Sequence, residues 1–336
     1  KTIAIGKWHL GAHESQRPLK RGFDEFFGFL SGGHKYFPEQ YTRNTIAEVN
    51  SQFDAYNTKL LKNDKRIDET EYLTDALSRE AVDFIARNHN NQFFMYLAYN
   101  APHAPLQATE QYLSRYNHIK DKKRRTFAAM VSAVDDGVGE ILEELKKHKI
   151  EENTLIVFLS DNGGNESKGA NNGILNKGKG TLYEGGIRVP FAMQWKGKIP
   201  QKSIYENPVT SLDIFATATE LAQVKPKNAL DGVNLIPYLQ ANNSSKPHRE
   251  LYWRMHDKEA LAIRFDDSKY LVDKKGKRLL FNLKTDISET ENLEDSIKMK
   301  ELENIHRQWN ANNIPPRFLG LLQNKTYNKL HPDRYE

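Results

Sequence analysis

The chain has 336 residues, of which 38% are hydrophobic and 28% are charged, a balance typical of globular proteins that allows one large domain or two. No apolar run approaches the roughly 18 residues that a membrane-spanning helix needs, and we expect no membrane partner. The net charge of +5 comes from scattered Lys and Arg residues, which predicts no nucleic-acid groove but suits an anionic substrate. Cysteine is absent, which excludes disulfides, thiolate metal sites and a Cys nucleophile within these residues.

The chain opens with no initiator Met and no signal peptide, and a short apolar strand is predicted over Thr2–Ile5, so we expect sequence upstream to be missing. Residues 12–70 are rich in Gly, aromatic and charged residues without clear periodicity, which predicts long surface loops. Apolar residues at helical spacing then predict a helix over Glu71–Asn88, followed by a strand over Gln92–Tyr99. That strand ends at residues 100–105, where two prolines forbid regular structure.

The middle of the chain continues to alternate, with further helices and strands expected over 122–149, 154–159, 189–195 and 211–222. Ser211 is the expected N-cap of the last of these helices. From about Arg249, four short apolar segments joined by charged turns predict an antiparallel meander, and a charged helix is expected over 289–309. We therefore predict an α/β domain with a largely parallel sheet over 1–245 and a smaller antiparallel α+β subdomain over 246–336.

Asp161 and Asn162 lie at the end of the strand over 154–159. A carboxylate beside an amide carbonyl offers two hard oxygen ligands, which suits Ca²⁺ or Mg²⁺, and open α/β sheets bind ligands at the C-terminal ends of strands. The same Asp-Asn-Gly-Gly sequence is also a good turn, and taken alone that simpler interpretation is the stronger one.

Cationic and titratable side chains follow other predicted strand ends. Lys7 and His9 stand two residues apart between glycines, and His103 lies in a Pro-His-Ala-Pro turn. Each alone could be an ordinary surface residue, but together they would suit a tetrahedral dianion. The loop Gly173–Thr181 nearly matches the phosphate-binding pattern G-x-x-x-x-G-K-[ST], yet Gly180 occupies the hydroxyl position and no long helix is expected to follow, which argues against an NTPase.

Three longer motifs make a family resemblance specific: GKWHLG at Gly6–Gly11, LSDNGG at Leu159–Gly164 and GKGTLYEGGIRVP at Gly178–Pro190. In this order they resemble the signatures of the formylglycine-dependent sulfatases of the alkaline-phosphatase-like superfamily. The likeness extends through RGFD at Arg21–Asp24, NAPH at Asn100–His103 and the strand-rich end of the chain. It is greatest to bacterial carbohydrate sulfatases, which implies a periplasmic or secreted protein.

The resemblance implies a role for each of these residues. Asp161 and Asn162 would ligate Ca²⁺, Lys179 would bind a sulfate oxygen, and Lys7 would bridge sulfate and formylglycine. His9 would assist collapse of the hydroxyl-bearing intermediate, and His103 would serve the leaving oxygen. The reaction would be hydrolysis of a sulfate monoester on a sugar, through a covalent hemiacetal sulfate.

The resemblance also implies an upstream portion that carries paired Asp ligands and the Cys/Ser-x-Pro-x-Arg sequence that becomes formylglycine. We expect no such pentapeptide within residues 1–336, and we expect these residues alone to be inactive. Two alternatives remain open: a phosphatase or phosphodiesterase of the same superfamily, and an inactive homologue that only binds sulfated glycans. For recognition of the sugar, we expect His34, in a flexible loop with aromatic neighbours, and Arg254 and His256, after a strand of the subdomain, to border the pocket.

Overall fold

The computed structural model describes residues 1–44, 51, 53–240 and 244–316. Within these ranges the chain forms two compact units. Unit 1 comprises residues 1–150 and 167–170, and unit 2 comprises 151–166 and 171–316. The division falls near residue 150, so the domain boundary predicted near residue 245 is not the point at which these units separate, and it stays a prediction.

Unit 1 is built on a mixed five-stranded sheet of order β4-β3-β2-β1-β5. The central strand β1 (Thr2–Lys7) pairs in parallel with β2 (Glu25–Phe29) on one side and β5 (Phe94–Ala98) on the other. Strands β3 (Leu60–Lys62) and β4 (Lys65–Ile67) extend the sheet in antiparallel fashion beyond β2. The strands predicted at Thr2–Ile5 and Gln92–Tyr99 are thus confirmed and are neighbours in space.

Glycines allow the three parallel strands to approach closely near their C-terminal ends. Gly6 has a φ of +95°, and a Cβ atom there would lie 2.1 Å from the Ala98 carbonyl oxygen. A Cβ on Gly28 would in turn lie 2.1 Å from the Gly6 carbonyl oxygen. Since no side chain fits in either place, these glycines permit the close approach of the three strands just before Lys7.

The prediction that residues 12–70 form surface loops is wrong in large part, because β2, β3 and β4 lie within them. Strand β2 is buried on both faces, so its apolar residues show no alternation of the kind that reveals a half-exposed strand. Tyr36 is completely buried too, and its hydroxyl donates to the His103 carbonyl oxygen at 2.8 Å. This region is therefore part of the core.

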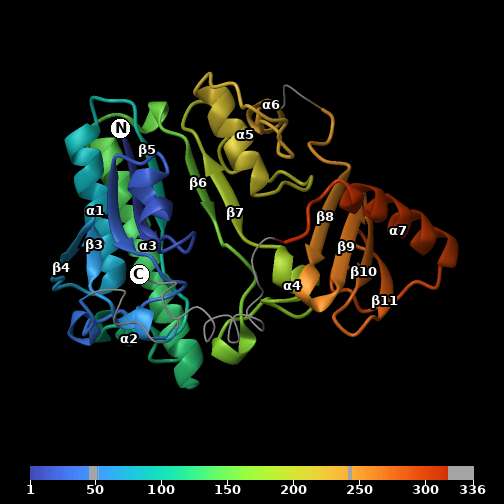
Figure 1. Cartoon of the computed structure of the whole chain (residues 1–336), viewed down its shortest axis with the longest axis horizontal. Helices are drawn as coiled ribbons and strands as arrows, with labels where there is room; N and C mark the ends of the chain where they lie inside the picture. Colours follow the sequence, from blue (N-terminus) through green and yellow to red (C-terminus); the bar gives the residue numbers. More distant parts are fainter. Residues whose placement is uncertain (45–50, 52, 241–243, 317–336) are drawn as a thin grey trace. The chain divides into compact units, whose positions relative to one another are not determined.

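Helices α1 (Leu73–Asn88) and α3 (Lys122–Lys147) confirm two further predictions and pack against each other in unit 1 (Figure 1). The apolar side of α1 also covers β1, β2 and β5. The short helix α2 (Glu110–Leu113) packs against α3. Phe84 and Leu77 of α1, together with Phe27 and Met130, are among the fully buried residues of the unit 1 core.

Unit 2 begins with an antiparallel pair, β6 (Ile156–Leu159) and β7 (Phe191–Gln194). The short helices α4 (Glu184–Ile187) and α6 (Ile236–Leu239) and the longer α5 (Leu212–Leu221) accompany it. Ser211 occupies the N-cap position of α5 as predicted, but its side chain makes no capping bond. Instead, Asp213 in the first turn accepts from the Thr210 N–H at 2.8 Å.

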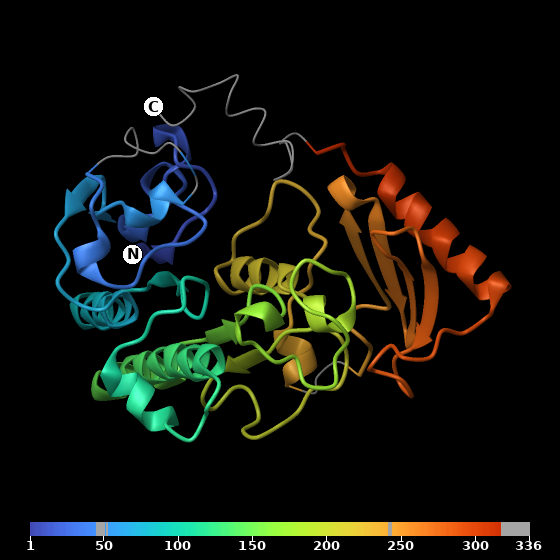
Figure 2. The same ribbon diagram turned by 90° about the horizontal axis from the view of Figure 1, so that it is seen from below.

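The end of unit 2 is the predicted antiparallel meander, of order β11-β10-β9-β8. One face packs against α7, as Figure 2 shows, with Leu302 of the helix on Tyr270 and Ile263 of the sheet. The other face packs against Leu182 and its neighbours. The elements are β8 (Glu250–Met255), β9 (Ala260–Phe265), β10 (Ser268–Val272), β11 (Arg278–Asn282) and α7 (Ser296–Ala311).

The two units together confirm the predicted fold class, an α/β part followed by a smaller antiparallel α+β part. Across the described ranges, no helix is both long enough and apolar enough to cross a membrane.

Candidate active site

Lys7 and His9 stand at the C-terminal end of β1. Lys7 is the last residue of the strand and pairs with Phe29 of β2. The main chain continues along β2 because the Trp8 and His9 N–H groups donate to the Phe29 and Leu30 carbonyl oxygens at 3.0 and 3.3 Å. His9 then turns at a φ of +53°. Its ring lies against Gly32, where a Cβ atom would come within 2.6 Å of Nε2.

His103 is held in one ring orientation by its own backbone. Its Nδ1 lies 2.7 Å from the Ala104 carbonyl oxygen, and a carbonyl can only accept, so Nδ1 carries the proton in the neutral ring. The Tyr36 hydroxyl bonds to the His103 carbonyl oxygen and the His103 N–H donates to the Asn100 carbonyl oxygen. Nε2 is then the nitrogen that carries no proton in the neutral ring.

The topology of unit 1 gathers these three residues at one edge of the sheet. Lys7 and His9 follow β1, His103 follows β5, and the two strands are parallel neighbours. C-terminal ends of parallel strands share an edge, where open α/β sheets place ligands. The edge therefore carries one fixed positive charge and two imidazoles.

Asp161 and Asn162 follow β6 in unit 2, as predicted. Ser160 donates from its hydroxyl to the Asn162 carbonyl oxygen at 2.8 Å, which closes the turn. The Asn162 amide nitrogen donates to the Gly163 carbonyl oxygen at 3.1 Å, so the amide oxygen points away from that contact. The exposed Asp161 carboxylate and this amide oxygen are hard donors of the kind that calcium prefers.

The donor set is incomplete for calcium, which takes six to eight oxygen ligands. Within the described ranges, no group of three or more His, Cys, Asp or Glu side chains is arranged to hold a metal ion. Asp161 and Asn162 therefore fit one part of a hard-cation site, by the chemistry of their oxygens, and further ligands would be needed.

The loop of Lys179 lies directly against the Asp161–Gly164 turn. The Lys179 N–H donates to the Gly164 carbonyl oxygen at 3.1 Å, and the Gly163 N–H donates to the Gly186 carbonyl oxygen at 3.0 Å. A Cβ on Gly163 would lie 1.7 Å from the Gly185 carbonyl oxygen, so the two backbones touch where no side chain could stand between them. The predicted metal ligands and the predicted sulfate-binding lysine are thus neighbours within unit 2.

A buried ion cluster behind this loop was missed by the sequence analysis. Lys269 of β10 is completely buried, and its amino group lies 2.8 Å from a Glu184 oxygen and 2.7 Å from a Glu289 oxygen. Glu289 also accepts from the Glu184 N–H at 2.6 Å. Burial raises the pKa of Glu289, and the nearby Lys269 opposes that shift. A charged residue at an inward position of the apolar strand Ser268–Val272 was the available signal.

The turn after β8 brings His256 beside the Lys179 loop. Lys258, two residues further on, donates from its amino group to the Gly180 carbonyl oxygen at 2.9 Å. His256 itself is exposed. Arg254 behaves differently, because its guanidinium donates to the Asn310 side chain at 2.9 Å and to the Ile314 carbonyl oxygen at 2.6 Å. These contacts hold Arg254 against the end of α7.

His34 does not occupy a flexible pocket rim, contrary to our prediction. It is 0% exposed, and its two ring nitrogens lie 2.8 and 2.7 Å from the Lys35 and Thr58 carbonyl oxygens. Phe29 and Tyr41 pack on the ring at centroid distances of 4.7 Å. Burial lowers the pKa of His34 from its usual 6.5 to about 4, against the raising effect of the two carbonyls. The physical reason for the error is that the aromatic neighbours form a core, not a surface.

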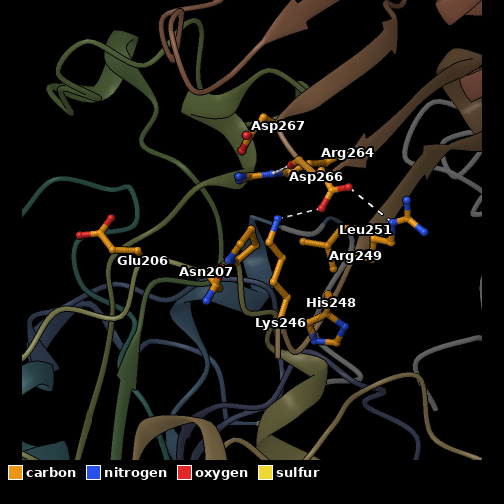
Figure 3. Close-up of a pocket in the computed structure, with 10 residues that line it drawn as sticks. Glu206, Asn207, Lys246, His248, Arg249, Leu251, Arg264, Asp266 and Asp267 are labelled. Atoms are coloured by element: carbon orange, nitrogen blue, oxygen red, sulfur yellow. Dashed lines mark hydrogen bonds and ion pairs between the residues drawn. The ribbon is translucent and has the colours of Figure 1, made fainter. Parts of the chain in front are cut away.

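A small cavity of about 60 Å³ lies elsewhere in unit 2 (Figure 3). It is lined by Lys246, His248 and Arg249 among others, and each of these three side chains contacts a carboxylate. Asp266 accepts from Lys246 at 2.8 Å and Arg249 at 3.4 Å, and the buried Asp213 lies 2.8 Å from His248.

Our expectation that residues 1–336 contain no Cys/Ser-x-Pro-x-Arg sequence is wrong, and the sequence that matches lies beside this cavity. Ser245–Arg249, SKPHR, does match the bare Cys/Ser-x-Pro-x-Arg pattern. It precedes β8, whereas Lys258 and the Lys179 loop follow the other end of that strand, five residue steps or about 17 Å away. The match is therefore remote from the candidate site, and its cationic side chains serve the ion pairs around Asp266.

As the sequence analysis predicted, Gly173–Thr181 does not form a phosphate-binding loop, because only the four-residue helix α4 follows it. A phosphate-cradling loop needs the N-terminus of a longer helix.

Comparison with known proteins decides the family. The profile described as Sulfatase matches residues 1–224, and the one described as N-sulphoglucosamine sulphohydrolase, C-terminal, matches residues 175–314. The chain belongs to the sulfatase family.

Curated relatives agree with this assignment. The chain is 34% identical over 283 residues to the uncharacterized sulfatase YdeN of Escherichia coli K12, across 75% of this chain and 47% of that protein. It is 32% identical over 247 residues to the N-acetylgalactosamine-6-sulfatase of Homo sapiens, across 70% of this chain and 45% of that protein. The sulfatase chain thus spans about half the length of these relatives.

Solved structures extend the likeness to nearly all of the chain. Ps i-CgsB, solved in complex with k-i-k-neocarrahexaose, is 40% identical with a TM-score of 0.89, covering 99% of this chain and 76% of that one. The PsFucS1 sulfatase from Pseudoalteromonas sp. is 25% identical with a TM-score of 0.75, covering 93% and 70%.

The buried His34 predicts a pH dependence of stability. Its folded pKa is depressed, so between pH 6.5 and about 4 the unfolded chain binds the proton and the folded chain does not. Stability should therefore fall as the pH drops through this window, by about 3 kcal/mol from this residue. In His34→Gln, which cannot titrate, urea unfolding at pH 4 to 7 should show a correspondingly flatter curve. Parallel curves for the two proteins would contradict the assignment.

Proposed function

We propose that this sulfatase hydrolyses sulfate monoesters on a carbohydrate. The observation that carries the proposal is the arrangement of Lys7, His9 and His103 at one sheet edge of unit 1, and of Asp161, Asn162 and Lys179 in one loop pair of unit 2. Each group lies within the residues that match the sulfatase family.

Each candidate residue of this chain would then have a separate role in cleavage of the sulfate ester. Sulfate ester cleavage develops negative charge on the sulfate oxygens and on the leaving oxygen. The amino groups of Lys7 and Lys179 would bind and neutralise the sulfate oxygens. His103, whose Nδ1 is engaged by the Ala104 carbonyl oxygen, would deliver a proton from Nε2 to the leaving oxygen. His9, which follows Lys7 at the end of β1, would act as a base that removes a hydroxyl proton when sulfate is released.

Two components would come from outside this chain. We propose that paired Asp ligands would complete a calcium site begun by Asp161 and Asn162, and that a formylglycine would act as nucleophile. Bound calcium would supply charge stabilisation to the sulfate oxygens. The relatives' greater length leaves room for both, since the chain spans 47% of the Escherichia coli protein. Residues 1–336 alone should therefore bind calcium weakly and turn over no ester.

The proposed substrate is a sulfated oligosaccharide of the carrageenan type. The 40% identity to Ps i-CgsB, which binds k-i-k-neocarrahexaose, supports this class. We propose that the exposed His256 contacts the sugar. The turn that carries His256 lies against the Lys179 loop, because Lys258 in this turn donates a hydrogen bond to the Gly180 carbonyl oxygen. A periplasmic or secreted location would suit such a polymeric substrate.

The function is tested by comparing an aryl sulfate with the matching aryl phosphate on the full-length protein. We expect turnover of the sulfate to dominate. Lys179→Ala should lower kcat/KM by roughly 100-fold or more, since it removes a preorganised charge from the transition state. Lys198→Ala, which removes the same charge from another exposed position, is the matched control and should retain full activity.

Preferred turnover of the phosphate would instead establish the phosphatase alternative. Binding of sulfated oligosaccharide without turnover of either ester would establish the glycan-binding alternative.

His256→Ala should change selectivity. We expect the ratio of kcat/KM for a carrageenan oligosaccharide to kcat/KM for an aryl sulfate to fall about 10-fold, because a sugar contact is lost while the sulfate contacts remain. His118→Ala, at another exposed histidine, should leave the ratio unchanged. Equal losses on both substrates would assign His256 to catalysis or folding.

A further inference from the structure

We propose that Asn172 is a positioning residue that sets the place of Lys179 relative to Asp161 and Asn162. The inference rests on the proposed function of those three residues. Asn172 is not part of any role assigned above, and its side chain lies between the two loops that carry them.

The Asn172 amide pairs with both polar groups of one glycine. Its oxygen accepts from the Gly164 N–H at 2.8 Å, and its nitrogen donates to the Gly164 carbonyl oxygen at 3.1 Å. An amide matched in this way to a backbone N–H and C=O imitates a rung of a β-ladder. Gly164 is thereby fixed in both position and orientation.

The same amide nitrogen also donates to the Lys177 carbonyl oxygen at 2.9 Å. Lys177 precedes Lys179 by two residues, and the Lys179 N–H donates back to the Gly164 carbonyl oxygen at 3.1 Å. Asn172, Gly164 and the 177–179 backbone therefore form one closed set of hydrogen bonds. Gly178 lies inside it, where a Cβ would come 2.7 Å from the Asn172 amide nitrogen.

This set matters because it holds the main chain from which the Lys179 side chain extends. That side chain is exposed, and the 171–180 segment contains no helix or strand. A displacement of about 1 Å at a reacting centre can cost a factor of 100 in rate. The Asn172 bridge supplies the rigidity that a long, flexible lysine side chain lacks at its base.

The test is a double-mutant cycle in the full-length protein with an aryl sulfate. Asn172→Ala should lower kcat/KM by roughly 10- to 100-fold, mainly through kcat. Combined with Lys179→Ala, it should add less than about threefold, since it acts through that lysine. Asn172→Asp keeps the bond from the Gly164 N–H but sets a carboxylate oxygen against the Gly164 and Lys177 carbonyl oxygens, so its loss should be at least as large as that of Asn172→Ala. Asn171→Ala, whose oxygen contacts only the Gly173 N–H among the described residues, is the matched control. Losses that multiply in the double variant would overturn the proposal.

Hydrogen exchange tests the bridge without reference to activity. In Asn172→Ala the Gly164 and Lys179 amides should exchange at least about 10-fold faster than in the wild type, whereas Asn171→Ala should leave them unchanged. Unchanged protection in Asn172→Ala would overturn the proposal. If the wild type hydrolyses no sulfate ester, the proposed function fails while the exchange result still decides the role of Asn172.

Discussion

Direct contact between two backbones organises unit 2. Where Gly163 meets Gly185, a side-chain carbon would lie 1.7 Å from a carbonyl oxygen, so only glycine permits the two loops to touch. This contact brings the Asp161–Gly164 turn onto the Lys179 loop. The Lys179 loop is fastened on its other side to the antiparallel sheet, through Leu182 in the apolar core and Glu184 on the buried Lys269. The candidate metal ligands, the candidate sulfate ligand and the sheet consequently belong to one compact body.

Unit 1 also positions its candidate residues through close backbone contacts, but these contacts join parallel strands of a sheet. Its parallel strands approach through Gly6 and Gly28, and Lys7, His9 and His103 follow the strand ends at one edge. The core beneath this edge is aromatic, and the buried His34, whose pKa is lowered by burial, is part of it. The position of His103 depends on that core, because Tyr36 bonds to its carbonyl oxygen. Polar groups at the edge are thus supported by packing below.

Periodic segments were predictable from the sequence, and close backbone contacts were not. Helix α3 and the terminal meander have clear apolar patterns, and the bounds predicted for α3 agree with the structure to within a few residues. Strand β2 is buried on both faces and shows no alternation, so it was mistaken for a loop. His34 was misplaced because aromatic neighbours occur in cores as well as at sugar-binding rims, and here Phe29 and Tyr41 are core residues that pack on its ring. Lys269 acts through contacts with residues far away in the chain, which no local pattern encodes. Asn172 acts within one irregular loop, where no periodic pattern marks its role.

The central claim is that the amino group of Lys179 binds a sulfate oxygen beside a cation held by Asp161 and Asn162. It is tested most directly by a crystal structure of the full-length protein with product sulfate bound. The account predicts the amino group of Lys179 within about 3 Å of a sulfate oxygen, beside a cation ligated by Asp161 and Asn162. A sulfate bound away from Lys179, or a cation that Asp161 and Asn162 do not ligate, would contradict the account.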